Sequence, residues 1–206
     1  MSDELVPSEP VQAIGENSVS NGVPDREEAG PFDDSEVSSV RPWVDLGSVK
    51  LIPREGLNLR LEVEEGTGRV VAASLDFKGS TLQIQPFSAS RSAGLWDSIR
   101  DELKTQLQQQ SGVVDEVTGP LGIELRASVP VMVPNEGLST QPARFIGVDG
   151  PRWFLRGVIA GPAATDEELG AEMIEIFRGL VVVRGNSPMP PRELLPLRVP
   201  VQASGV

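Results

Sequence analysis

Apolar and polar residues alternate strictly along LNLRLEVEE, residues 57–65. This period of two predicts a β-strand with one face buried and the other in water. The segments RVVAASLDF (69–77) and STLQIQPF (80–87) continue the same pattern, and GTG (66–68) and Lys78-Gly79 separate the three segments as turns. We therefore expect a three-stranded antiparallel meander with one apolar face.

Two later segments have the helical period instead. Near residues 93–110 and 165–180, apolar residues recur every three or four positions, which predicts amphipathic helices that pack on a sheet. At the start of the second segment, Thr165 and Glu168 have the spacing of a capping box, with Thr165 as the expected N-cap.

Strand patterns fill the rest of the central chain: VVDEV, IELRASVPVMV, the hairpin considered below, and VVVRG. Runs of strands with two interspersed helices are typical of an α+β fold. We expect one domain at residues 41–185, in which two helices pack a twisted antiparallel sheet of about seven strands.

The two ends of the chain differ from this body. Residues 1–40 carry ten acidic groups and one arginine, whereas residues 41–206 carry twenty acidic and seventeen basic groups, so most of the net charge of −12 belongs to the first segment. With so few apolar residues, residues 1–40 are expected to form a disordered acidic tail. Residues 186–206 are Pro-rich and are expected to form an extended C-terminal strap.

The composition excludes many kinds of chemistry. The chain has no Cys, His or Tyr. Disulfides, thiolate nucleophiles, Ser-His-Asp triads and His or Cys metal sites are therefore excluded. Carboxylate-metal chemistry stays open, but we expect no catalytic residue, no metal site and no cofactor.

Charge and hydropathy limit the possible partners. The net acidic charge makes nucleic acid an unlikely partner, because neutralising phosphates needs a net basic face. The apolar runs are too short to span a membrane. Because MSDELVPSEP at the start lacks the features of a secretory signal, we expect a cytoplasmic protein.

PARFIGVDGPRWFLRGVIAG, residues 142–161, is the most distinctive segment, because it places three arginines around an Asp-Gly-Pro turn. With a three-residue loop at 149–151, Arg144 faces Arg156, and Arg144, Arg152 and Arg156 all lie on one face of the sheet. A loop of two or four residues would place Arg144 on the other face. We expect the three-residue loop.

That register also predicts the position of Trp153. Gly147 would lie opposite Trp153 and leave room for its indole, with Phe145 and Leu155 alongside. We therefore expect Trp153 to be buried beneath a helix, on the face away from the arginines.

The three arginines have two interpretations. An arginine cluster on a sheet can hold phosphate or carboxylate through bidentate hydrogen bonds. Alternatively, carboxylates of the two helices neutralise it and the charges form a solvated ladder; the candidates are Asp97, Asp101, Glu102, Glu168, Glu172 and Glu175.

Five segments together resemble an actinobacterial family catalogued as a domain of unknown function (thirty-seven-ten): RPWVDLGSVKL, GRVVAASL, LQIQPFSASRSAGLWDSIRDEL, QPARFIGVDGPRWFLRGVIAG and FRGLVVVRGNSPMPPRELLPLRVP. The likeness covers about residues 40–200. It implies a cytoplasmic actinobacterial protein and carries over no catalytic residue. The order of strands and helices is also similar to Mog1/PsbP-like and secretion-chaperone-like α+β folds, which mostly bind partners.

Two functions follow from these features. The leading hypothesis is a non-enzymatic protein-binding or adaptor domain, because catalytic residue types are missing and both ends are of the kind that carries recognition segments. The alternative is a small-anion or nucleotide-binding protein, possibly with carboxylate-metal chemistry, that uses Arg144, Arg152 and Arg156.

Overall fold

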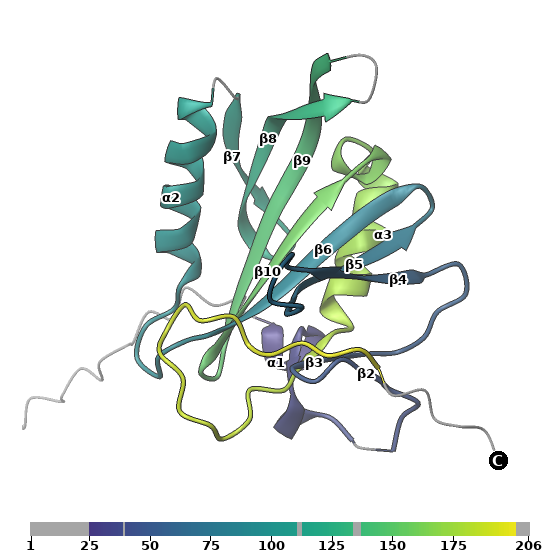
Figure 1. Cartoon of the computed structure of the whole chain (residues 1–206), viewed down its shortest axis with the longest axis vertical. Coiled ribbons are helices and arrows are strands. Elements are labelled where there is room, and N and C mark those ends of the chain that lie inside the picture. Colours follow the sequence, from purple (N-terminus) through teal and green to yellow (C-terminus); the bar gives the residue numbers. More distant parts are fainter. Residues whose placement is uncertain (1–24, 39, 111–112, 134–136, 201–206) are drawn as a thin grey trace, which may run out of the picture.

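A seven-stranded antiparallel sheet forms the centre of the molecule (Figure 1). The computed structural model describes residues 25–38, 40–110, 113–133 and 137–200. Across the sheet the strands are β4 (Asn58–Val63), β5 (Val70–Phe77), β6 (Ser80–Ser88), β10 (Trp153–Ala160), β9 (Gly137–Gly150), β8 (Gly122–Val133) and β7 (Val114–Gly119). The expected α+β class, the meander and the number of strands are confirmed.

Four further strands form a second, smaller sheet, which the sequence patterns did not predict. One of them lies in VVVRG, which was expected to belong to the large sheet. The order of the smaller sheet is β1 (Phe32–Asp33), β11 (Val181–Val182), β3 (Val49–Leu51) and β2 (Val44–Asp45). Strands β1 and β11 run parallel, and the other pairs are antiparallel. Strands of two or three residues are too short to show an alternating pattern in the sequence.

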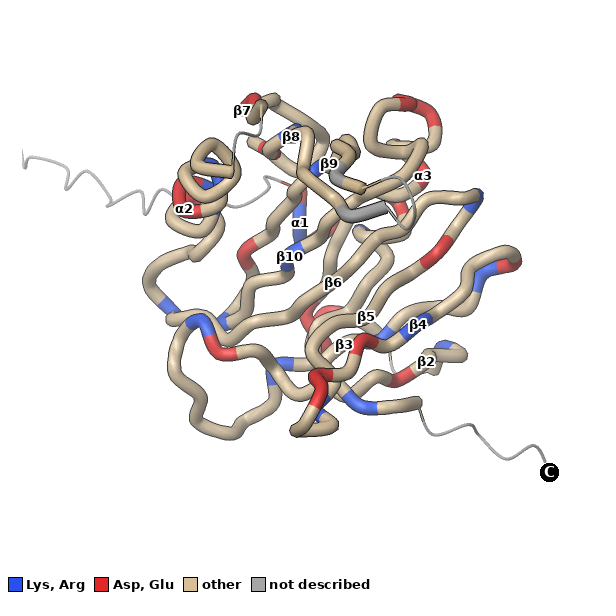
Figure 2. The backbone as a smooth tube through the Cα atoms, turned by 45° about the horizontal axis from the view of Figure 1, so that its top comes forward, with Lys and Arg blue, Asp and Glu red and all other residues tan. Residues whose placement is uncertain are grey.

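Two longer helices cover opposite faces of the large sheet (Figures 1 and 2). Helix α2 (Trp96–Gln109) packs over β7, β8 and β9, and α3 (Glu167–Arg178) packs on the other face. The shorter helical elements are α1 (Arg26–Ala29), η1 (Asp34–Glu36) and η2 (Pro162–Ala164). The expected N-cap of α3 was wrong by one residue, because the Asp166 side chain, not Thr165, accepts the hydrogen bond from the Leu169 N–H at 2.9 Å.

The β9–β10 hairpin has a two-residue turn, Pro151-Arg152, and not the expected three-residue loop. Trp153 pairs with Gly150, so Arg156 lies opposite Gly147 and Arg144 lies opposite Ile159. Since directly paired residues share a face, Arg144 and Arg156 project from opposite faces of the sheet. The expectation that all three arginines share one face was therefore wrong.

Trp153 is fully buried, as expected, but its surroundings differ from the expectation. Its indole N–H donates to an Asp33 carboxylate oxygen at 2.8 Å, and the Arg26 guanidinium lies 5.7 Å from the ring centre. The glycine that makes room for it is Gly150, because a Cβ there would overlap the indole. Gly147 instead makes room for Trp96 of α2.

Residues 25–38 are part of the fold, which corrects the expectation of a tail up to residue 40. Arg26 is buried and pairs with Glu36 at 2.6 Å, while Phe32 pairs with Val181 in the small sheet. Residues 1–24, the rest of the expected tail, lie outside the described part of the chain.

Residues 187–200, which we call the C-terminal strap, cross the molecule in an extended path (Figure 1). Leu195 and Leu197 are buried, and the Leu195 N–H donates to the Pro86 carbonyl at 2.9 Å. The strap therefore docks on the body as a structural element, as its Pro-rich sequence suggested, and residues 201–206 are not among those described.

Burial of Trp153 gives a first prediction. Trp153→Ala should reduce the free energy of unfolding by about 3–5 kcal/mol, because it leaves a large cavity and an unpaired Asp33 carboxylate. Arg152→Ala, one residue away in the turn, should change it by less than about 1 kcal/mol. Urea melts of the two variants measure the contrast, and similar losses in both would contradict this account of the core.

Asp76 gives a prediction on acid stability. Hydrogen bonds from Arg60, and then Thr81, lower the pKa of Asp76 from 3.8 to about 2. A carboxyl with a lowered folded pKa stabilises the fold above its ordinary pKa, and this contribution is lost as the pH falls through about 2.

Asp76→Asn should therefore be less stable than the unmodified chain near pH 6, by no more than about 1 kcal/mol because the pair is partly solvated. The difference should shrink as the pH falls from about 4 toward 2. Melts at several pH values test this, and a difference that is independent of pH would show that the charge of Asp76 contributes nothing.

Candidate functional site

Arg144 is a structural residue. It is 5 % exposed, and its Nε and Nη2 donate to the two carboxylate oxygens of Glu124, which is 2 % exposed, at 3.0 and 2.9 Å. Arg126 donates to the same carboxylate at 2.9 Å. Gly170 of α3 leaves space for the Arg144 guanidinium, since a Cβ there would overlap Nη1. A guanidinium so enclosed and paired has no access to an external anion.

Arg156 lies on the other face of the sheet. It donates to the side-chain oxygen of Gln85, and its guanidinium lies 5.9 Å from the ring centre of Phe87. Burial lowers the pKa of Arg156, and its buried Nε has no hydrogen-bond partner among the described residues. Arg156 is thus a half-buried cation without a carboxylate.

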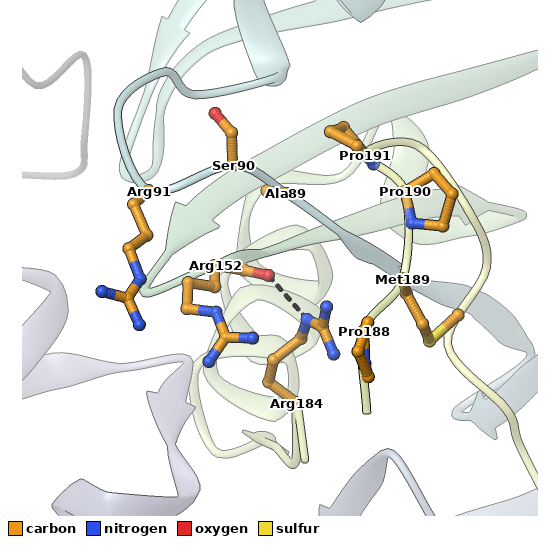
Figure 3. A pocket seen from close by; sticks show the side chains of 9 residues that line it. All are labelled: Ala89, Ser90, Arg91, Arg152, Arg184, Pro188, Met189, Pro190 and Pro191. Atoms are coloured by element: carbon orange, nitrogen blue, oxygen red, sulfur yellow. Dashed lines mark hydrogen bonds between the residues drawn. The ribbon is translucent and has the colours of Figure 1, made fainter. Parts of the chain in front are cut away.

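Arg152 lies apart from Arg144 and Arg156, in a different group of residues. It borders a shallow pocket of about 500 Å³ together with Arg91 and Arg184 (Figure 3). Arg91 comes from the loop between β6 and α2, Arg152 from the β9–β10 turn, and Arg184 follows β11. The rest of the lining is Ala89, Ser90, Pro188, Met189, Pro190 and Pro191.

Arg184 connects three segments that border this pocket through hydrogen bonds of its guanidinium group. Its Nε donates to the Arg152 carbonyl at 3.0 Å, Nη1 to the Ser187 carbonyl at 3.1 Å, and Nη2 to the Ser88 hydroxyl at 3.0 Å (Figure 3 shows the first bond). These three bonds join the hairpin turn, the strap and β6. Arg184 therefore fixes the geometry while keeping two of its five N–H donors for other partners.

Asp149 positions the loop that carries Arg91. Its carboxylate accepts hydrogen bonds from the backbone N–H groups of Leu95 and Trp96 at 2.6 and 3.1 Å, so it caps the N-terminus of α2 from the hairpin. Burial raises the pKa of Asp149, and these two bonds oppose that rise. Asp149, the acidic residue nearest in sequence to Arg152, therefore binds the N-terminus of α2 and does not pair with Arg152.

The positive charge of the pocket is not neutralised within the described part of the chain. There, no carboxylate lies within 4.0 Å of a guanidinium nitrogen of Arg91, Arg152 or Arg184. Burial, and then the charge of Arg152, lowers the pKa of Arg184. Three cations that repel one another around one opening favour the binding of an anion.

The backbone of Arg152 is also unusual. Arg152 has a φ of 64°, in the left-handed region that glycine normally occupies. Lys78 and Arg192 also have positive φ, but their side chains pair with Glu172 and Glu102. Arg152 has no such partner to offset its strain, and strained residues of this kind cluster at functional sites.

The helix carboxylates do not neutralise the three candidate arginines as the solvated-ladder interpretation required. Glu172 pairs with Lys78, Glu102 with Arg192, and Asp97 with Arg100. Arg144 is neutralised from the neighbouring strand β8 instead. The structure thus separates Arg144, Arg152 and Arg156 into three environments.

One comparison with known proteins decides the family. The family model described as "Protein of unknown function (DUF3710)" matches residues 30–205. The chain belongs to this family. The matched range includes the three pocket arginines, the hairpin and the strap.

Other comparisons add little. Among curated proteins no relative matches the chain. A solved structure from Bacteroides thetaiotaomicron has a TM-score of 0.39 at 17% identity, over 71% of this chain and 50% of the other, so the chain spans half the length of that protein. The PsbP protein CyanoP of Synechocystis sp. PCC 6803 has a TM-score of 0.37 at 7% identity, over 66% of this chain and 86% of that one.

Sequence reasoning identified one pocket residue, Arg152, and missed Arg91 and Arg184. Arg91 lies three residues after the end of β6, among small residues in SASRSAG, and Arg184 lies two residues after the end of β11, in VVVRGN. The sequence signal that could have identified them is an arginine in a loop without an acidic residue beside it. Their convergence depends on strand order, which the sequence does not display.

The pocket lining consists of arginine, serine and apolar side chains. Its lining contains no carboxylate. In the described part of the chain, no group of three or more acidic side chains is arranged to hold a metal ion.

No helix in the described part of the chain is long and apolar enough to cross a membrane.

The half-buried charge of Arg156 gives a prediction. Arg156→Met should raise the free energy of unfolding by about 1 kcal/mol, because an apolar side chain of similar length replaces an unpaired cation. Arg60→Met removes the same charge from an exposed pair with Asp76 and should lower the free energy of unfolding slightly, the opposite direction. Urea melts give both values, and a destabilised Arg156→Met variant would mean that the fold needs this guanidinium.

Proposed function

We propose that the chain is a non-enzymatic binding module that holds an anionic group of its partner in the pocket of Arg91, Arg152 and Arg184. The observation that carries this proposal is the gathering of three guanidinium groups, without a carboxylate partner in the described chain, around one open pocket. This site differs from the one expected from the sequence, which combined Arg152 with Arg144 and Arg156.

The charge favours a phosphate group over a carboxylate. A phosphate monoester carries about two negative charges at pH 7, and its oxygens accept bidentate hydrogen bonds from guanidinium groups. Arg91 and Arg152 form no hydrogen bond through their side chains to other described residues, so their donors are available. A dianion would offset more of the repulsion among the three arginines than a single carboxylate would.

The wall beside the arginines favours a ligand with an apolar part next to the anion. Pro188, Pro190 and Pro191 with Met189 form this side of the pocket, and three of the four have no backbone N–H. The same chemistry can come from a phosphorylated protein, as an adaptor requires, or from a free phosphorylated small molecule. On the strength of the family resemblance, we also propose that the protein acts in the cytoplasm of an actinobacterial cell.

Arg152→Gly separates binding from folding. Glycine adopts a φ of 64° without strain, so stability should change by less than about 1 kcal/mol. Inorganic phosphate should raise the melting temperature of the unmodified chain relative to chloride at equal ionic strength, and this rise should be lost in Arg152→Gly. Saturation at about 100 times the Kd corresponds to about 2.7 kcal/mol of stabilisation.

Two controls sharpen this test. Arg41→Gly removes an exposed arginine outside the pocket and should keep the full effect of phosphate. Phosphoserine peptides and sugar phosphates, compared with their unphosphorylated forms, distinguish a protein partner from a small molecule. Equal stabilisation of Arg152→Gly and the unmodified chain, or no effect of any of these phosphates, would contradict the proposal.

A further inference from the structure

Strand β4 ends the large sheet with an open edge. It pairs with β5 on one side only, and both views place it at the margin of the sheet beyond β5 (Figures 1 and 2). The backbone N–H and C=O groups on its other side therefore have no strand partner among the described residues. Such edges are templates for pairing with another strand unless something protects them.

The sequence of β4 lacks the backbone features that usually protect an edge. Its six residues, NLRLEV, contain neither proline nor glycine, and the bulge at its end arises where Glu62 pairs with Ala72 and Val63 with Val70. The extra residue, Val71, is on β5, so β4 keeps its regular alternation. Charged side chains at Arg60 and Glu62 are the remaining protection. Within the chain, Arg60 pairs with Asp76, and Glu62 accepts hydrogen bonds from Ser74 and Gln83, so contacts across the pair would add to these or replace them.

Those charges do not oppose pairing of β4 with a second copy of itself. If the two strands run antiparallel with Leu61 opposite Leu61 of the other copy, Arg60 lies opposite Glu62 twice, and Leu59 lies opposite Val63 twice. The opposed pairs are then of opposite charge on one face and apolar on the other. Both kinds of cross-strand pair are favourable.

Neighbouring registers lack this complementarity. Centring the pair on Arg60 places two arginines directly opposite, and centring it on Glu62 places two glutamates opposite, which is destabilising. A shift by one residue puts apolar side chains opposite charged ones and reverses the faces. Of these registers, the one centred on Leu61 alone pairs opposite charges without opposing like ones, and a closed two-fold pair is the commonest form of homo-oligomer.

We propose that two copies of the chain associate through β4, antiparallel and centred on Leu61, to form one continuous sheet. Val63 is 53% exposed in the single chain, and its contact with Leu59 of the other copy would cover it. Strand β10, which begins at the arginine pocket, is separated from β4 by β5 and β6. The pair therefore leaves both pockets open and presents two anion sites on one body, which favours a partner with two anionic groups.

Cysteine cross-linking tests the register, because the chain has no native cysteine. Under mild oxidation, Leu61→Cys should form a disulfide-linked species at twice the chain mass of 22.0 kDa. Directly opposed residues have Cα separations that a disulfide can bridge. Val63→Cys is the matched control, because it is more exposed but does not face itself. It should remain mostly monomeric alone and should cross-link when mixed with Leu59→Cys.

Charge reversal tests the same pair without cysteine. Glu62→Arg places two arginines opposite on each side and should shift the full chain from dimer to monomer in sedimentation experiments. Because Glu62 also accepts hydrogen bonds from Ser74 and Gln83 within the chain, a melting profile of each variant shows that it is folded at the temperature of the experiment. The double variant Arg60→Glu with Glu62→Arg restores opposite charges and should restore the dimer. An unmodified chain that is monomeric at high concentration, or faster cross-linking of Val63→Cys than of Leu61→Cys, would overturn the proposal.

Discussion

The two-residue turn between β9 and β10 is the constraint on which most of the structure depends. Pro151 and a left-handed Arg152 close the hairpin, so Trp153 pairs with Gly150. This register sends Arg144 to the face covered by α3 and Arg156 to the face of α2. It also places the Arg152 carbonyl where the Ala89 N–H and the Arg184 guanidinium both donate to it. The arginine pocket is thus a direct consequence of the turn.

Charge is distributed unevenly over this framework. On the body of the sheet, arginines are matched by carboxylates, as in the buried pair of Arg144 and Glu124 and the exposed pair of Arg60 and Asp76. At the pocket, Asp149 is committed to the start of α2, and the described chain offers no other carboxylate to the arginines there. A net acidic protein therefore has a local excess of positive charge, which an anionic partner can balance.

The sequence predicted what depends on local periodicity and failed where distant segments meet. Alternation along residues 57–65 identified β4, since a strand places alternate residues on opposite faces. Loop length in GVDGPRW was misjudged because Phe145, Trp153 and Leu155 were expected to share one inner face, whereas Phe145 pairs with Val158 and lies on the face opposite Trp153 and Leu155. Residues 25–38 looked disordered because their order comes from non-local contacts, such as Asp33 with Trp153. The pocket was missed for the same reason, since Arg91 and Arg184 are far apart in the chain.

Arg91, Arg152 and Arg184 are proposed to form one site for a tetrahedral dianion. Crystals of the full chain soaked with selenate or tungstate would test it most directly, because the heavy atom of the anion is located by its anomalous scattering. The account predicts a principal peak between these three guanidinium groups, beside Pro190, which disappears in crystals of Arg152→Gly. A principal peak elsewhere, or one that persists without the Arg152 side chain, would contradict it.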